Sequence, residues 1–499
     1  MDYTILLAGT PILIILLVLF VFRKPLIVAS PIAFIVTLLI GIFYWKVPYE
    51  RIAGSTMKGG FVALDIVMII FGALLLLEFM KQTKLINSLE YYLSKISPDM
   101  RVQAIIIVWF FGAFIEGAAG FGTPAAVVAP LLVGLGFSPI SAVVGALIAN
   151  STAVVFGAVG TPIKLGLSGL DVSGVSVMTA GINLSIGIIV PLMMVTAIIL
   201  SNKGKWKDVL DIAPFALLSG ILFVIPYFLL SFLGPEFPSL LGSIIGLGLL
   251  YFMIRLKVLM PHNIWKLKKK KTLKAEHSLF DTVLPYIILT SILIASKIII
   301  LQTQVKIIEG INHNIIYLGP AMAFFITLIV CRFLLGYTEF SFRNAFNSIF
   351  SKIGKAFIII LVTTAFVQIM INSGINNSGL DSMVHTLAIV LQTPMLGFIA
   401  PFIGAFGAFI AGSATVSNIM FGALQNTAAT SIGYNTTAVL SLQTVGAGAG
   451  NMIALNNIIA AQTTVGLHDQ EAEIFKKTII PCLIYLVLAG IIGLIIGIV

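Results

Sequence analysis

The 499-residue chain is far more apolar than a soluble protein: hydrophobic residues make up 59% of it, charged residues 10%, and the mean hydropathy is +1.11. Soluble domains are about half apolar and a quarter charged, so a polytopic membrane protein is indicated. The net charge of +10 does not point to nucleic acid, because the 29 Lys and Arg residues are spread over loops. For the one dense basic cluster, Lys266–Lys271, we expect membrane lipid as the partner.

Apolar runs of about 20 residues, the length that crosses a bilayer as a helix, recur along the chain. They cover residues 5–22, 26–44, 61–80, 175–200, 209–233, 239–256, 281–301, 315–335, 357–373 and 478–499. The first run follows no basic residue and has no small-residue cleavage site, so we expect a retained helix. Cys331 and Cys482 stand alone in apolar segments and indicate neither a disulfide nor a metal site.

The Lys and Arg residues predict which loops share a side of the membrane. If Arg23 and Lys24 lie inside, the same side holds the basic loops 81–101, 203–207, 257–280 and 343–355. Loops 234–238 and 374–383, which have no Lys or Arg, then lie outside. Loop 45–60 breaks the rule, because its three basic residues would be external.

The same local pattern occurs at Gly112–Gly117 (GAFIEG) and Gly407–Gly412 (GAFIAG). The charge-based topology places the two stretches in opposite orientations, which predicts an inverted repeat. Each region has room for a full crossing plus a re-entrant pair of half-helices. We therefore predict an all-α polytopic membrane protein with about 12 transmembrane helices and two re-entrant helical hairpins. Full crossings throughout remain the alternative, since hydropathy does not distinguish re-entry from spanning.

Three parts follow from this division. Residues 1–256 form the N-terminal repeat, with a hairpin near 112–137. Residues 257–280 form a basic cytoplasmic loop. Residues 281–499 form the C-terminal repeat, with a hairpin near 407–433.

The first hairpin segment suits a substrate site better than a lipid-facing helix. Its glycines and Pro124 break the helix and leave backbone amides free to point at an anion. The candidates for substrate binding here are Gly117, Gly120, Gly122 and Thr123. Glu116 is the sole acid of the region and is costly unpaired in lipid, so we expect it to face a cavity and carry the coupling proton. The alternative is a neutral Glu116 that only hydrogen-bonds the hairpin in place.

Asp65 also lies inside an apolar run and is the second candidate for proton coupling. Intramembrane carboxylates are rare, and they usually pair with another polar group or serve a transport pathway. Asp65 is therefore expected to have a polar neighbour.

The second hairpin segment offers hydroxyl and amide groups without a charge. The candidates for substrate binding are Ser413, Thr415, Ser417 and Asn418. Such groups suit the oxygens of a hydroxy acid or a dehydrated cation. The alternative is that they bond back to their own helix or join neighbouring helices.

Polar residues also follow each hairpin at similar distances, as Asn150 and Thr152 in one half and Gln443 and Asn451 in the other. We expect these to lie on broken crossings whose breakpoints face the hairpin tips and complete one binding site. The alternative for the glycines at 446, 448 and 450 is that they only permit tight helix packing.

No pattern of an enzyme competes with transport. The sequence contains no HExxH pair, no GxSxG elbow, no Walker lysine and no acid pair at metal-ligand spacing within one membrane segment. We therefore expect no catalytic residue, no bound metal and no cofactor. A passive anion channel is the other class to be weighed, and it would give flux without concentrative uptake.

Several stretches closely resemble the L-lactate permease family over nearly the whole chain. They are Phe71–Glu78 (FGALLLLE), Phe114–Ala126 (FIEGAAGFGTPAA), Ala129–Phe137 (APLLVGLGF), Gly407–Ser413 (GAFIAGS) and Leu424–Gln425. The resemblance implies a proton-coupled symporter of lactate and related 2-hydroxy monocarboxylates such as glycolate, in the plasma (inner) membrane. It also implies kinship with elevator-type carriers, in which a transport domain moves against a dimeric scaffold, so we expect a homodimer. Sodium coupling is the alternative, because the neutral oxygens of the second hairpin also suit Na⁺.

Two departures bear on specificity. Many family members have an aspartate where this chain has Ala414, and a GKMISPQ run where this chain reads GNMIALN over Gly450–Asn456. This chain thus lacks both an acid and a base that many family members have. Because both charges are absent, the sequence leaves open the preferred substrate and the choice between H⁺ and Na⁺.

Overall fold

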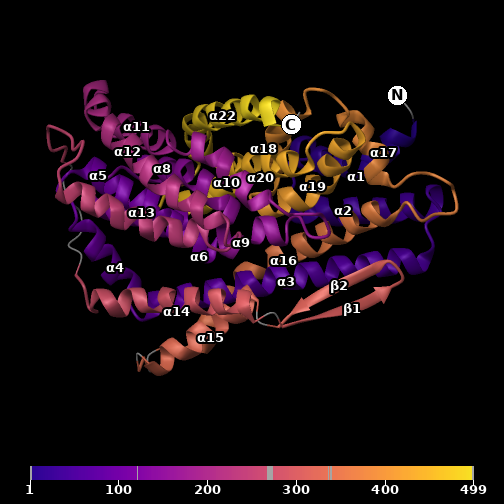
Figure 1. Cartoon of the computed structure of the whole chain (residues 1–499), viewed down its shortest axis with the longest axis horizontal. Coiled ribbons are helices and arrows are strands. Elements are labelled where there is room, and N and C mark those ends of the chain that lie inside the picture. The colour runs from indigo at the N-terminus through magenta and orange to yellow at the C-terminus, as the bar shows by residue number, and fades with distance from the viewer. Residues whose placement is uncertain are drawn as a thin grey trace.

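The computed structural model describes residues 3–120, 122–266, 274–299, 301–317, 319–334, 336–337 and 340–496, without the side chains of residues 351 and 352. Most of the Lys266–Lys271 cluster therefore lies outside the described residues, as does Phe121. The rest of the chain is predominantly helical (Figure 1).

The N-terminal half, up to the predicted basic loop, contains seventeen helical segments. They are α1 (Tyr3–Leu16), η1 (Leu17–Val21), α2 (Leu26–Leu39), η2 (Ile40–Tyr44), α3 (Tyr49–Gln82), α4 (Leu85–Ser94), α5 (Met100–Ala104), η3 (Ile105–Phe111), α6 (Gly112–Ala119), α7 (Thr123–Leu135), α8 (Pro139–Ala153), η4 (Val154–Phe156), α9 (Gly157–Lys164), α10 (Val175–Ile186), α11 (Val190–Ser201), α12 (Trp206–Ser231) and α13 (Pro238–Arg255). This count covers only the described part of that half.

The C-terminal half contains helices and a short sheet. Its elements are α14 (Leu279–Ile298), β1 (Gln302–Ile308), β2 (Ile311–Ile316), α15 (Pro320–Leu334), α16 (Phe342–Asn372), α17 (Met383–Ala388), η5 (Ile389–Leu391), α18 (Leu396–Ala411), α19 (Ala414–Ser431), α20 (Thr436–Gly450), α21 (Leu455–Thr464) and α22 (Glu471–Ile496).

Among the described residues, eleven helices are long and apolar enough to cross a membrane, or twelve if α10 and α11, bent by 49° at their junction, form one span. The predicted all-α polytopic membrane fold is thus confirmed. The predicted crossing at 315–335 is not a single long helix, because it contains the end of β2 and the 15-residue α15.

The antiparallel hairpin of β1 and β2 was not predicted. Gln302 pairs with Ile316, and the turn at Gly310 has a φ of 74°, which favours glycine. The signal was present, since residues 302–316 flank a Glu309-Gly310 turn with β-branched residues on both sides. The β-hairpin packs against α3.

The first repeated segment ends one arm of a helical hairpin. α5, η3 and α6 form the first arm and α7 the second, and the chain turns at Gly120 and Gly122, whose φ values are +59° and +78°. At the open end, the ring of Phe137 lies 6.3 Å from that of Trp265, and the backbone N–H of Trp265 donates to Asp99 Oδ2 at 2.9 Å. The end of the second arm thus returns to the start of the first.

The second repeated segment ends the first arm of a similar hairpin, made of α18 and α19. The chain turns at Gly412, with φ +69°, and Ser413 caps α19. The Tyr434 hydroxyl donates to the carbonyl of Pro394 and closes the open end. Both hairpins begin upstream of the predicted ranges near 112–137 and 407–433. The first turn glycine lies eight residues after the start of the GAFI sequence in the first hairpin, at Gly120, but five residues after it in the second, at Gly412.

The two hairpins approach the centre of the molecule from opposite ends. In Figure 1 the first runs in from the left, where α5 is labelled, and the second follows α17 on the right. This is the arrangement expected of an inverted repeat. Re-entry into the bilayer, and the division at 257–280, remain predictions.

Each hairpin is followed by a helix that is broken near the same central region. After α8 and η4, residues Ala158, Val159 and Gly160 have φ values of 42°, 56° and 77° and interrupt α9. In the other half, α20 ends at Gly450 and α21 begins at Leu455. Of the four polar residues expected at the breaks, only Asn451 lies at one; the other three precede the breaks, on α8 and α20.

The glycines before the second break serve close packing, which was the alternative interpretation. A Cβ atom at Gly446 or Gly450 would overlap the carbonyl oxygen of Pro401 or Ala405 on α18. A Cβ atom at Gly448 would lie 2.5 Å from the carbonyl oxygen of Ser151 on α8. The helix break itself follows these glycines, at residues 451–454.

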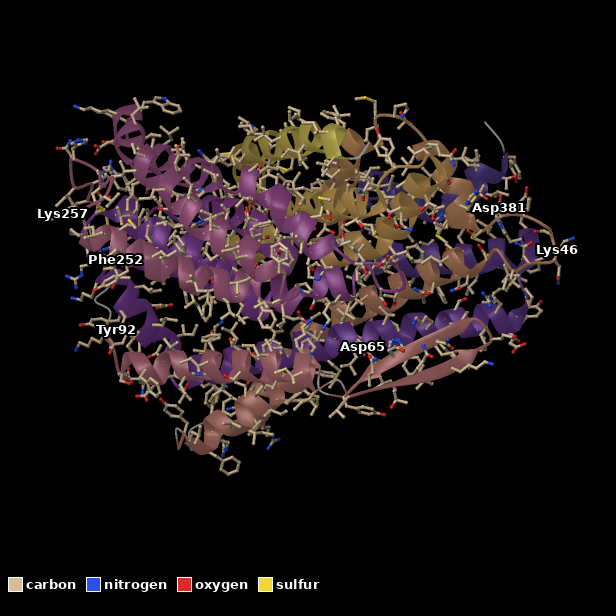
Figure 2. The ribbon with its side chains drawn as sticks, viewed as in Figure 1. Lys46, Asp65, Tyr92, Phe252, Lys257 and Asp381 are labelled. Carbon is tan, nitrogen blue, oxygen red and sulfur yellow. The ribbon has the colours of Figure 1, made fainter. Side chains whose placement is uncertain are left out.

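Charged loops that were predicted to share a side meet at one end of the molecule. Lys84 pairs with Glu276 at 2.8 Å, and Arg101 with Asp211 at 3.2 Å. At the other end, the N–H of Asn377 donates to the carbonyl of Lys46 at 3.1 Å, which joins loops 45–60 and 374–383. Figure 2 shows Lys257 at one end and Lys46 and Asp381 at the other. Which end is cytoplasmic remains a prediction.

Candidate functional site

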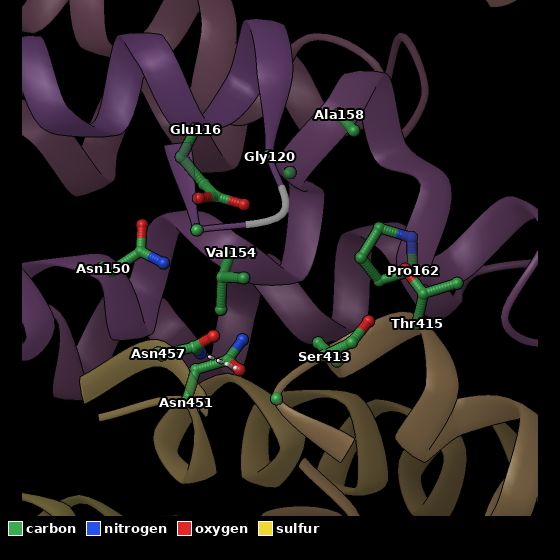
Figure 3. A pocket seen from close by; sticks show the side chains of 14 residues that line it. Glu116, Gly120, Asn150, Val154, Ala158, Pro162, Ser413, Thr415, Asn451 and Asn457 are labelled. Atoms are coloured by element: carbon green, nitrogen blue, oxygen red, sulfur yellow. Dashed lines mark hydrogen bonds between the residues drawn. The ribbon is translucent and has the colours of Figure 1, made fainter. Parts of the chain in front are cut away.

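A small cavity lies where the two hairpin tips meet the two helix breaks; we call it the hairpin cavity (Figure 3). It is lined by Glu116, Gly120, Gly122, Asn150, Val154, Gly157, Ala158, Pro162, Gly412, Ser413, Ala414, Thr415, Asn451 and Asn457. Four segments that are far apart in sequence thus contribute to one site. Convergence of broken helices on a central site is the usual design of secondary transporters.

Glu116 is the only ionisable side chain in this lining. It lies in the last turn of α6, 1% exposed, and its carboxylate packs against Gly157, where a Cβ atom would overlap Oε1. Among the described residues, neither Glu116 Oε2 nor the nearby buried Asn150 Oδ1 has a hydrogen-bond partner. Two buried acceptors in one wall lack a donor, and a proton on Glu116 would supply one.

The groups in the cavity that suit an anion are at helix ends. α19 and α21 begin at it, and the first N–H groups of a helix have no partner within the helix. In α19 the Ser413 hydroxyl accepts from the N–H of Val416 at 3.3 Å. Ala414 and Thr415, the first two residues of this helix, both line the cavity. An anion can therefore be held without a basic side chain.

Asn457 lies between the two tips and was not predicted. Positions for a Cβ atom at Gly122 and Gly412 lie 3.8 Å and 3.4 Å from its Oδ1, and its Nδ2 donates to Asn451 Oδ1 at 3.0 Å. The available signal was the Asn456-Asn457 amide pair directly after the break. Besides Asn457, six further lining residues are not among the predicted site residues: Val154, Gly157, Ala158, Pro162, Gly412 and Ala414.

Half of the predicted site residues line the hairpin cavity. These are Glu116, Gly120, Gly122, Asn150, Ser413, Thr415 and Asn451. The others, Asp65, Gly117, Thr123, Thr152, Ser417, Asn418 and Gln443, do not line it.

Ser417, Asn418 and Gln443 form a buried network behind the second tip. Ser417 Oγ donates to the Gly404 carbonyl at 2.7 Å, and Gln443 Nε2 donates to Ser417 Oγ at 3.0 Å. Asn418 Nδ2 donates to the Pro162 carbonyl at 2.9 Å and to Thr444 Oγ1 at 3.1 Å. These groups join neighbouring helices, which was the alternative interpretation, and position the tip against the first break.

Three more predicted residues have structural contacts. A Cβ atom at Gly117 would lie 2.5 Å from the Leu240 backbone nitrogen, so this glycine lets α6 pack on α13. Thr123 Oγ1 donates to the Gly120 carbonyl at 2.7 Å and stabilises the tip. The Thr152 carbonyl accepts from the Tyr227 hydroxyl at 2.8 Å. None of the three presents its side chain to the hairpin cavity.

Asp65 lies on α3, away from the hairpin tips. Its Oδ2 is 3.1 Å from His313 Nε2, and it lines a separate cavity together with Lys164. It has the polar neighbour that was expected, but the structure does not place it with Glu116.

The hairpin cavity is closed around its lining. About 20 Å³ of it is open to the centre of a water molecule, which is room for about one water. A ligand much larger than a water molecule therefore does not fit this cavity as it stands.

Comparison with known proteins agrees with this architecture. The L-lactate permease family matches residues 4–310 and 297–499. The chain is 28% identical to an L-lactate permease of Salmonella typhimurium, over 98% of this chain and 94% of the relative. It is 28% identical to the glycolate permease GlcA of Escherichia coli, over 98% and 95%, and 27% identical to an L-lactate permease of Bacillus subtilis, over 92% and 89%.

The match covers almost all of the chain. The long apolar helices and the permease relatives together indicate a multi-pass protein of the plasma membrane. Permeases are transporters. The chain belongs to the L-lactate permease family.

Proposed function

We propose that this chain is a secondary active transporter that moves L-lactate, or a related 2-hydroxy monocarboxylate such as glycolate, together with a proton. The names of its relatives, L-lactate permease and glycolate permease, support this substrate class. The transporter acts without an enzymatic step or a bound cofactor, and it works as a homodimer in which the hairpin unit moves against a scaffold.

The observation that carries the proposal is the position of Glu116. It is the single ionisable group in the lining, and it is buried with an oxygen that lacks a hydrogen-bond donor. Helix N-termini and the Ser413 and Thr415 hydroxyls on the opposite wall suit a carboxylate and a 2-hydroxyl group. The site thus has one place for a proton and one for an organic anion.

This arrangement couples the two ligands through charge. A carboxylate anion and a proton cancel each other, so the loaded site crosses the low-dielectric interior at a lower cost than the anion alone. With Glu116 ionised, a second negative charge in the same small cavity is repelled. Protonation of Glu116 therefore precedes substrate binding.

Sodium coupling is the second candidate, and one observation favours it. The lining offers neutral oxygens from Ser413, Thr415, Asn451 and Asn457, which are ligands that a hard cation accepts. Uptake that requires Na⁺ and ignores a pH gradient would select this candidate over the proton symporter.

Uptake into proteoliposomes tests the function. Radiolabelled L-lactate is followed with and without an inward proton gradient, in the presence of unlabelled glycolate, pyruvate or a dicarboxylate. We expect accumulation that needs the gradient and competition by glycolate but not by the dicarboxylate. Flux without accumulation would indicate a channel instead.

A further inference from the structure

A second cavity lies on the far side of the first helix break; we call it the lateral vestibule. Residues that line it include Asp65 and Met68 on α3, and Val159, Thr161 and Lys164 on α9. About 80 Å³ of it is open to the centre of a water molecule, so it holds several waters and exceeds the hairpin cavity.

The interrupted segment of α9 is the wall between the two cavities. Gly157, Ala158 and Pro162 line the hairpin cavity, whereas Val159, Thr161 and Lys164 line the lateral vestibule. The wall includes the left-handed residues 158–160, which are held by no regular helix. A small ligand that passes this segment moves directly from one cavity to the other.

The lateral vestibule contains a cation from an ion triad around the buried Glu236. Lys164 Nζ lies 2.7 Å from Glu236 Oε1, and Lys297 Nζ lies 2.9 Å from Glu236 Oε2. Burial alone would raise the pKa of Glu236, but the two lysines outweigh it and hold the pKa below the ordinary value. Glu236 is therefore ionised, and the triad carries one excess positive charge.

Lys164 can bind a further anion. Its side chain is 31% exposed, and only one of its three ammonium donors is needed for Glu236. An anionic acceptor on the vestibule side would neutralise the excess positive charge of the triad. An unbalanced charge is costly where water is scarce.

The acid on the opposite wall does not cancel this charge. Asp65 is paired with His313 and lies near Lys58. Burial and the charge of Lys58 lower the pKa of His313, so its imidazole is neutral at pH 7. Asp65 and Lys164 line the vestibule, and the charges next to them are those of Lys58, Glu236 and Lys297. This group of three lysines and two acids has one excess positive charge, which a single monoanion balances.

We propose that the lateral vestibule is a second carboxylate site, at which Lys164 binds a small monocarboxylate on its way to or from the hairpin cavity. The proposal rests on the proposed function for the identity of the transported acid. The attraction of the vestibule for small anions does not depend on it.

Thiol modification in purified, detergent-solubilised protein tests the site independently of transport. Met68 is 44% exposed and lines the vestibule, so Met68→Cys places a thiol there, whereas the native Cys331 and Cys482 are buried. Its reaction rates with anionic sulfonatoethyl and cationic trimethylammonioethyl methanethiosulfonate are compared. Met395→Cys, 46% exposed at the far end of the second hairpin, gives the reference ratio.

We expect the anionic reagent to be favoured at position 68 relative to the reference, and Lys164→Gln to abolish this preference. Lys164→Arg retains it, and Lys297→Gln, which removes the same charge outside the lining, reduces it less. Sodium glycolate at millimolar concentration slows the anionic reagent only when Lys164 is present. If Lys164→Gln misfolds, Lys164→Met keeps a long apolar side chain without the charge and is expected to lose the preference as well.

An anionic preference that is absent, or unchanged without Lys164, overturns the proposal. If the preference depends on Lys164 but glycolate gives no protection, the vestibule attracts anions without binding carboxylates, and the proposal also fails. If both results are as expected but proteoliposomes take up no monocarboxylate, the proposed function fails and the vestibule site stands.

Discussion

The carboxylate of Glu116 rests directly on Gly157, where even a single added carbon would overlap its Oε1 and lie 3.1 Å from Cδ. This contact joins the first hairpin to the first broken helix. Gly157 has φ −64° and ψ 158°, a conformation that alanine also adopts. A methyl group here therefore acts on Glu116 and not on the backbone.

Gly157→Ala is expected to displace Glu116 and to reduce proton-driven uptake by up to about a hundred-fold, as misplacement of a reacting group by an ångström can. Initial uptake rates in proteoliposomes measure the effect. Gly354→Ala is the matched control, because a Cβ atom there meets nothing within 4 Å. Equal rates for the two variants would show that the Glu116–Gly157 contact is unimportant.

Gly446→Ala is expected to destabilise the protein by about 1–3 kcal/mol, the range for overpacking a closely packed interior. The reason is the backbone of α18, whose Pro401 carbonyl occupies the space of the new methyl group. Thermal unfolding in detergent, followed by fluorescence-detected size exclusion, measures it. An unfolding temperature equal to that of Gly354→Ala would refute the close approach of α18 and α20.

Thr415→Val and Asn418→Ala should distinguish a residue that binds substrate from one that stabilises the second hairpin. Thr415 lines the hairpin cavity, so loss of its hydroxyl should raise the KM for lactate several-fold, equivalent to about 0.5–1.5 kcal/mol, with the unfolding temperature unchanged. Asn418 hydrogen-bonds the Pro162 carbonyl, so its loss leaves a buried group unpaired and should cost about 1–3 kcal/mol of stability. The reverse pattern, with the KM effect confined to Asn418→Ala, would restore Asn418 to the binding site.

Glu236→Gln should change the pH dependence of stability. The folded-state pKa of Glu236 lies below its ordinary value of 4.5, so its stabilising contribution is fully present above that pH and is lost as the pH falls through the folded-state pKa. Because Lys164 and Lys297 are about a third exposed, we expect less than the roughly 3–5 kcal/mol of a fully buried pair. Unfolding is measured from pH 3.5 to 7 for both proteins. A difference that grows toward acid pH would contradict the ion triad.

The positions of the helix breaks could be predicted from the sequence, but the contacts between the broken segments could not. Glycine and proline at 120–124 and 157–162 indicate where a helix cannot continue, and the structure has breaks there. Which polar side chain faces the cavity depends on helix phase and on the neighbouring helix. Thr415 therefore lines the hairpin cavity, whereas Ser417, one half-turn further, bonds to Gly404 on α18.

Contacts between distant segments were the least predictable. The approach of Glu116 to Gly157 and of Asn457 to both tips spans up to several hundred residues and depends on how α6, α9 and α21 pack. The two GAFI sequences indicated the inverted repeat, but they do not fix the position of the turn, because the turn glycine lies eight residues after Gly112 and five after Gly407.

The central claim is that one carboxyl group at the meeting point of the two hairpins carries the coupling proton. Glu116→Gln in proteoliposomes tests it, with Glu78→Gln, an acid on α3 that lies outside the hairpin cavity, as the control. We predict that Glu116→Gln loses accumulation driven by a pH gradient and retains lactate exchange, while Glu78→Gln keeps both. Full pH-driven accumulation by Glu116→Gln would contradict the account.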